Sequence, residues 1–129
     1  MDSKEMMEKI EKKIREGIAK FKQVYKVPAD QVQIVFMLDE DNEVKFLTCV
    51  NYQLKHKVEL ADLIGKHITN FLVRSHLTKL LKKFAKEQND QDHTINLLAG
   101  LTEKDELYML LRKNNILIRK IEDPDELKI

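Results

Sequence analysis

Apolar residues recur every three or four positions at the start of the chain, with Lys and Glu between them. This period matches one face of an α-helix, so residues 1–27 are predicted to form a long amphipathic helix that ends before Pro28. Its apolar stripe contains Ile10, Ile14, Ile18 and Phe21. Such a stripe can pack on the chain's own sheet, or it can be the interface with the same helix of a second chain.

Two short apolar runs follow the helix and predict a β-hairpin. Residues 32–38 are rich in β-branched and aromatic side chains, and residues 43–52 form the return strand. The polar residues 39–42 between them suit a turn. Alternation along the return strand places Val44, Phe46, Thr48 and Val50 on one face and Lys45, Leu47, Cys49 and Asn51 on the other.

The helical period returns in the middle of the chain. Residues 58–64 predict a short helix that ends at Gly65, and residues 68–88 predict a longer amphipathic helix. The longer helix has an apolar stripe made of Val73, Leu77, Leu80, Leu81 and Phe84. Lys and Arg line its other sides, which predicts a solvated basic face.

The last third of the chain predicts three strands, over residues 94–99, 107–113 and 116–121. Asn114 and Asn115 form a two-residue turn, because Asn tolerates positive φ. This turn would place Arg112 opposite Leu117 and Leu111 opposite Ile118. A helix over residues 107–121 is the alternative, because Leu, Met and Lys are good helix formers.

Composition narrows the class of protein. The 129 residues suit one domain, and 23 Lys and Arg against 22 Asp and Glu leave a net charge of +1, which argues against a generally basic nucleic-acid binder. A hydrophobic content of 43% argues against a disordered chain. Cys49 is the single cysteine, and neither a signal peptide nor a membrane-spanning run is recognisable, so a cytoplasmic protein without a disulfide is expected.

The order of elements resembles that of PAS domains, which are α+β and have a five-stranded antiparallel sheet with helices on one face. Residues 36–44 resemble the first PAS hairpin, with Asn42 where a turn glycine is usual. Residues 62–72 are similar to the acidic-Leu-Ile-Gly-Lys segment of the family. The likeness covers residues 31–121 and leaves a long N-terminal helix before it and an acidic, loose tail, 122–129, after it. Roadblock and profilin-like folds share much of this order and stay open as alternatives.

The PAS resemblance implies a non-enzymatic signalling domain that senses a ligand or binds a partner signalling protein, as a homodimer formed through its N-terminal helix. It implies a cavity between sheet and helices. The cavity would be lined by Ile34, Phe36, Phe46, Phe71, Leu72, His76, Leu80, Phe84, Met109 and Leu111. These bulky side chains favour a filled cavity, so no cofactor is expected, with haem on His76 as the alternative.

No pattern in the sequence indicates a catalytic or metal site. A Gly-rich phosphate loop and a His-Glu-x-x-His motif are both missing. Asp39, Asp41 and Glu43 alternate like the start of a calcium loop, but its glycine and closing Glu are replaced by Val44 and Val50. The basic stretch 63–86 has no interleaved exposed aromatic residues to stack on bases, so nucleic acid is not the expected partner.

Overall fold

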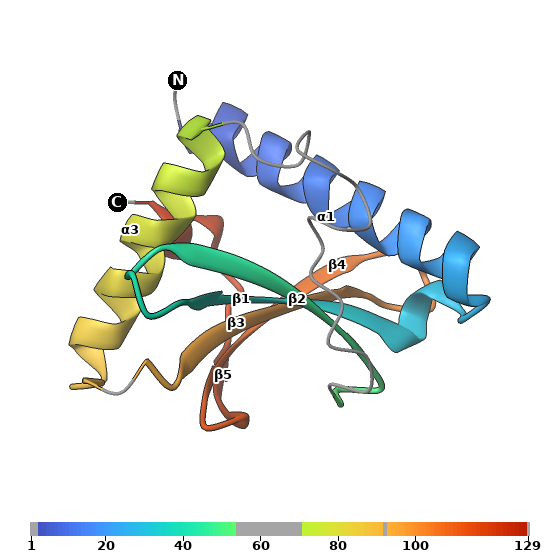
Figure 1. Ribbon diagram of the computed structural model, residues 1–129. Helices are drawn as coiled ribbons and strands as arrows, with labels where there is room; N and C mark the ends of the chain where they lie inside the picture. Colours follow the sequence, from blue (N-terminus) through green and yellow to red (C-terminus); the bar gives the residue numbers. More distant parts are fainter. Residues whose placement is uncertain (1–2, 54–70, 92, 129) are drawn as a thin grey trace.

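The computed structural model describes residues 3–53, 71–91 and 93–128 (Figure 1). Their elements are α1 (Ser3–Tyr25), η1 (Ala29–Gln31), β1 (Val32–Leu38), β2 (Val44–Val50), α3 (Phe71–Glu87), β3 (Ile95–Leu101), β4 (Leu107–Lys113), β5 (Ile116–Lys120) and η3 (Pro124–Leu127). The expected short helix at 58–64, and most of the PAS-like segment 62–72, lie outside the described residues.

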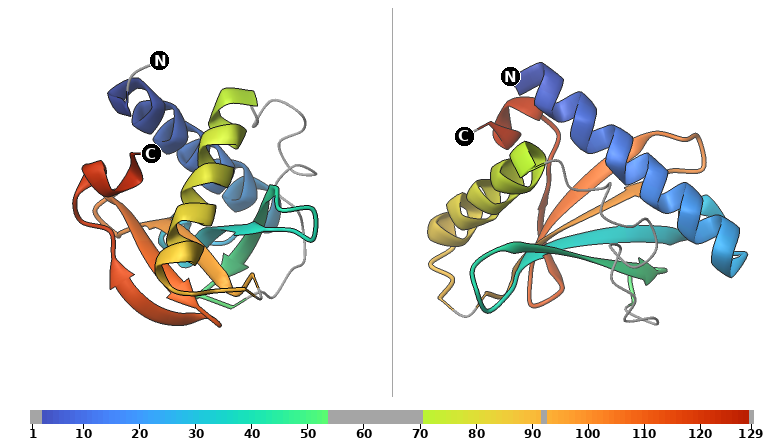
Figure 2. Two further views of the ribbon diagram at one scale, coloured as in Figure 1. Left: turned by 90° about the vertical axis from the view of Figure 1, so that its left-hand side faces the viewer. Right: turned by 45° about the horizontal axis from the view of Figure 1, so that its top comes forward.

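One antiparallel sheet of five strands forms the centre of the molecule. Its order is β2-β1-β3-β4-β5, so β2 and β5 are the two edges. The described α-helices, α1 and α3, both lie on one side of the sheet (Figures 1 and 2). The α+β class, the five-stranded antiparallel sheet and the long N-terminal helix are therefore confirmed. The face turned away from the helices is called the outer face below.

Residues with positive φ end the elements where the sequence predicted breaks. Lys26 follows α1 with a φ of 58°, and Pro28 two residues later cannot continue the helix. Asn42 has a φ of 59°, in the turn where Asp39 Oδ1 accepts hydrogen bonds from the backbone N–H groups of Asp41 (2.9 Å) and Glu43 (3.0 Å). These side-chain bonds replace backbone partners that the turn lacks.

The β4–β5 hairpin matches its predicted turn but not all of its predicted register. Asn114 and Asn115 have φ values of 52° and 62°, and Arg112 lies opposite Leu117 as expected. Leu111 pairs with Arg119 instead of Ile118, because the register shifts between Leu111 and Arg112. This β-bulge corrects the prediction of a regular hairpin. The alternative of a helix over residues 107–121 was wrong.

The core lies between the sheet and the two helices. The predicted stripe of α3 is buried throughout, and so are the sheet side chains that face it. The buried side chains of the sheet on this face include Val32, Ile34, Phe36, Leu38, Val44, Phe46, Val50, Ile95, Leu97, Ala99, Leu101, Met109 and Leu111. Alternation along β2 follows the prediction, because Cys49 belongs to a second cluster on the outer face, with Val35 and Leu98.

The acidic tail is packed against the domain, which corrects the expectation that it is loose. Leu127, in η3, is only 3% exposed. Its carbonyl oxygen is 2.8 Å from Nε2 of His76, and Lys83 Nζ donates to the carbonyl oxygens of Glu126 (3.4 Å) and Lys128 (3.2 Å). Arg119 forms an ion pair with Glu126 at 3.0 Å. The basic side of α3 and β5 therefore holds the tail by charge and by hydrogen bonds.

Candidate interaction surface

Most of the residues predicted to line a cavity do meet between the sheet and the helices. Seven of them are buried in the common core: Ile34, Phe36, Phe46, Leu80, Phe84, Met109 and Leu111. They pack against one another and against α1. The rings of Phe36 and Phe46 meet edge to face, with their centroids 5.3 Å apart. A void of about 10 Å³ lies beside these rings, at the lower limit of the space that one water molecule needs.

The other three predicted residues do not join this core. Leu72 is 50% exposed on the outer side of α3. His76 is half-buried, and its Nε2 contacts the carbonyl oxygen of Leu127, so it serves to hold the tail. The side chain of Phe71 lies outside what the structure describes.

The apolar stripe of α1 lies inside the chain. Ile10, Ile14, Ile18 and Phe21 are between 0% and 2% exposed, and all four belong to the common core. Of the two alternatives that the sequence left open, the structure therefore shows packing on the chain's own sheet. In this arrangement the stripe is not available as the interface with a second copy.

A polar cluster is buried on the outer face, across β1, β2 and β4. Gln33, only 1% exposed, accepts hydrogen bonds at Oε1 from the Cys49 thiol (3.5 Å) and the Tyr52 backbone N–H (2.8 Å), and its Nε2 donates to the Tyr108 hydroxyl (3.4 Å). Burial raises the pKa of Tyr108, and a hydrogen bond with the Tyr52 side chain raises it further. A Cβ on Gly100 would come within 2.6 Å of Cζ in the Tyr108 ring, which explains a glycine there.

Cys49 is expected to make the fold less stable in alkaline solution. Burial raises the pKa of its thiol from 9.0 to about 11. Between these values the folded chain keeps a proton that the unfolded chain loses, so stability falls as the pH rises through this window, by about 2–3 kcal/mol in total. Urea unfolding at several pH values would measure the loss, and Cys49→Ala should show a smaller one. Equal slopes in both proteins would contradict this assignment.

A guanidinium is also buried on the outer face. Arg112 is only 7% exposed, and its Nε donates to Oδ1 of Asn96 at 2.8 Å. Asn96 is 3% exposed and in turn donates through Nδ2 to Oδ1 of Asn115 in the hairpin turn, at 3.3 Å. Burial lowers the pKa of Arg112, because removal from water destabilises its charge. Within the described residues no carboxylate forms an ion pair with it.

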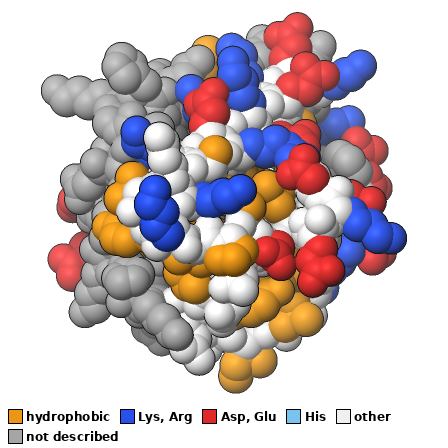
Figure 3. Space-filling model, turned by 90° about the vertical axis from the view of Figure 1, so that its right-hand side faces the viewer, with side chains coloured by type: hydrophobic (Ala, Val, Ile, Leu, Met, Phe, Trp, Pro, Cys, Tyr) orange, Lys and Arg blue, Asp and Glu red, His pale blue; other side chains and the backbone are white. Residues whose placement is uncertain are grey.

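The tip of the β4–β5 hairpin carries exposed apolar side chains. Ile116 is 71% exposed and Leu117 is 56% exposed, on the strand that forms one edge of the sheet. The hairpin projects at the bottom of the molecule in Figure 1. Figure 3 shows hydrophobic side chains gathered over the centre and lower end of the adjoining side, with most of the charged groups above them and to the right. Ile116 and Leu117 were predicted to lie in a strand, but their exposure was not predicted from the sequence.

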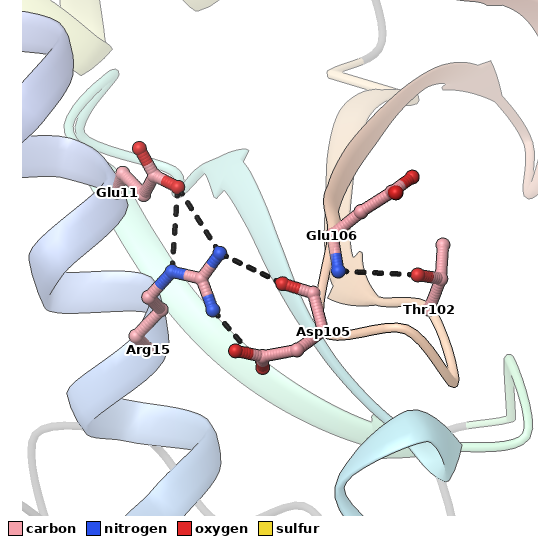
Figure 4. Close-up of polar contacts among 5 residues, drawn as sticks. All are labelled: Glu11, Arg15, Thr102, Asp105 and Glu106. Atoms are coloured by element: carbon pink, nitrogen blue, oxygen red, sulfur yellow. Dashed lines mark hydrogen bonds and ion pairs between the residues drawn. The ribbon is translucent and has the colours of Figure 1, made fainter.

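Arg15 joins α1 to the β3–β4 turn on another side of the molecule (Figure 4). Its guanidinium contacts Glu11 (3.2 Å), the Asp105 carboxylate (3.1 Å) and the Asp105 carbonyl oxygen (3.0 Å). Open grooves of about 840 Å³ and 900 Å³ flank this bridge. The charge of Arg15 is compensated within the chain by these two carboxylates, so Arg15 has a structural role and links the helix to the turn.

The described part of the chain shows no site for a metal and no membrane span. It contains no group of three or more His, Cys, Asp or Glu side chains suited to a metal ion. None of its helices is long and apolar enough to cross a membrane. Comparisons with known proteins found no matching family model, no matching curated protein and no matching solved structure. The surface of the molecule is therefore what suggests a function.

Proposed function

We propose that the chain is a non-enzymatic interaction module that binds another protein through the β4–β5 hairpin. The exposure of Ile116 and Leu117, at 71% and 56%, is the observation that carries the proposal. They are adjacent at the tip of an edge strand, with Leu117 opposite Arg112 on the outer face and Ile116 opposite Lys113 on the helix side. A partner that wraps around this edge of the hairpin can cover both side chains. Covering adjacent apolar side chains removes them from water, and this is the main driving force of protein association.

This proposal retains the interaction role implied by the PAS resemblance and applies equally to a Roadblock-like or profilin-like adaptor. The PAS assignment itself stays a prediction. Sensing of a small ligand has less support, because the described residues predicted to line a ligand cavity pack against one another and leave a void of about 10 Å³ beside Phe36 and Phe46. A homodimer would also have to use a surface other than the buried stripe of α1, and the hairpin offers one.

Replacement of Leu117 tests the proposal. Leu117→Ser should weaken capture of a partner from a native extract by at least about tenfold, because a lost buried Leu contact is worth roughly 1.5–3 kcal/mol. Val24→Ser is the matched control, since Val24 is a similarly exposed apolar residue, at 49%, on α1. Circular dichroism would confirm that both variants fold, and light scattering would show whether the partner is a second copy. Equal capture by both variants would overturn the proposed role of the hairpin.

A further inference from the structure

We propose that the partner presents a carboxylate to Arg112, from an Asp or Glu within an otherwise apolar segment that covers Leu117. This inference rests on the proposed function and specifies the chemistry of the partner. Arg112 and Leu117 lie directly opposite each other on neighbouring strands, so they share the outer face of the hairpin. One short segment can therefore contact both of them.

The charge distribution of the sheet supports an acidic partner. The five strands contain five cationic side chains and no Asp or Glu: Lys45, Arg112, Lys113, Arg119 and Lys120. Arg119 is neutralised by Glu126, and Lys113 on the helix side donates to the Gln88 carbonyl oxygen at 3.5 Å. Lys45, Arg112 and Lys120 are left on the outer face without a described carboxylate partner, so an acidic segment would complement this face.

Arg112 is held in place for such a contact. A guanidinium has five N–H donors, and Asn96 Oδ1 is the acceptor that the described residues provide for it. Asn96 is neutral, so this hydrogen bond orients the group without compensating its charge. A carboxylate can accept two parallel hydrogen bonds from a guanidinium, which is the strongest common pairing of this kind. The contact would stabilise a charge that burial has made unfavourable.

A protein segment fits this face better than nucleic acid does. Three cations are few for a phosphate backbone, which nucleic-acid binders often meet with about 6–10 contacts. Apart from Asn96, which lies opposite Arg112 on β3, the neighbouring groups are apolar: Leu117 lies opposite it on β5, and Leu98 and Leu110 form the next row of the outer face. Apolar neighbours around one oriented guanidinium suit a segment that combines an acidic residue with aliphatic ones.

Selection from a display library of short random peptides tests the inference on the whole chain. The selected sequences should be enriched in Asp or Glu next to Leu, Ile or Val. Arg112→Gln should remove the preference for acidic residues and weaken the best peptide by at least about tenfold, as expected for loss of a charged hydrogen bond. Lys20→Gln, which removes an exposed charge on α1, should leave both the preference for acidic residues and the affinity for the best peptide unchanged.

Direct observation of the Arg112 side chain gives a second test, which does not depend on the stability of the Arg112→Gln variant. In the unsubstituted chain, the Nε–Hε resonance of Arg112 should shift when the selected peptide binds. Peptides without acidic enrichment whose binding still depends on Leu117 would overturn the carboxylate inference and leave the proposed function in place. Failure to select any peptide whose binding depends on Leu117 would count against both the carboxylate inference and the proposed function. Tighter binding of a single-stranded oligonucleotide than of any peptide would show that the partner class is wrong.

Discussion

Replacing Ile14 by Asp is expected to unfold the chain rather than to separate two chains. Ile14 is 1% exposed and lies in the middle of the α1 stripe, facing the sheet. Removing a buried Ile side chain costs about 2–5 kcal/mol, and a carboxylate in its place has no described partner there. The combined loss, at least about 4 kcal/mol, is comparable with the whole stability of a small domain.

Urea unfolding followed by circular dichroism would measure the effect of Ile14→Asp. Lys12→Asp is the matched control, because it places the same carboxylate on the exposed side of α1 and should change stability by less than about 1 kcal/mol. Light scattering at the same concentrations distinguishes the alternative. A folded Ile14→Asp monomer derived from a wild-type dimer would show that the stripe is an interface between chains, contrary to its burial here.

The periodic elements could be predicted because local chemistry and burial agree along them. β1 and β4 have the predicted limits, Val32–Leu38 and Leu107–Lys113, since each is an apolar run between turn-forming residues. The two Asn residues of the β4–β5 turn adopt the expected positive φ for the same local reason. The order of the strands in the sheet could not be predicted in the same way, because it depends on the path of the connections between strands. The succession of elements does not determine on which side of the first hairpin the third strand pairs.

The features that escaped prediction depend on contacts between distant residues. The bulge in β5 changes the partner of Leu111 from Ile118 to Arg119, and Arg119 can then reach Glu126 in the tail. The tail looked like a polar terminus, but the side chain of Leu127 is buried in the common core, and His76 on α3 contacts its carbonyl oxygen. A single charged terminus gives no sign of such a contact in its own sequence.

The candidate site was missed because polar residues in a strand usually predict a solvated face. Gln33, Asn96 and Arg112 alternate with apolar residues and look like surface positions, but they are 1%, 3% and 7% exposed. Their burial follows from the sheet itself, whose outer face has its own apolar cluster beside them. Ile116 and Leu117 were missed for the converse reason. They look like core residues, and they lie at the edge of the sheet where no described element covers them.

Phe84→Ala is expected to lower the free energy of unfolding by about 3–5 kcal/mol, because Phe84 is 1% exposed at the centre of the core. Its ring also lies under two cations, with Lys83 Nζ and Arg119 Cζ each 5.6 Å from the centroid. Leu72→Ala, at a half-exposed position on the same helix, should cost less than about 1 kcal/mol. Phe84→Leu retains much of the apolar volume, so its loss of unfolding free energy should lie between those of Phe84→Ala and Leu72→Ala. Urea unfolding of the three variants would measure this order.

The same variant tests whether the core can hold a ligand. The void of about 10 Å³ among the described core residues is too small for any organic molecule, so benzene is expected to leave the melting temperature of the wild-type chain unchanged. Phe84→Ala removes a ring from the same core, and an apolar cavity of that size binds benzene, so its melting temperature should rise with added benzene. Stabilisation of the wild type by benzene would instead show that the core opens to small apolar molecules. A ligand-sensing role would then be favoured over an interaction module alone.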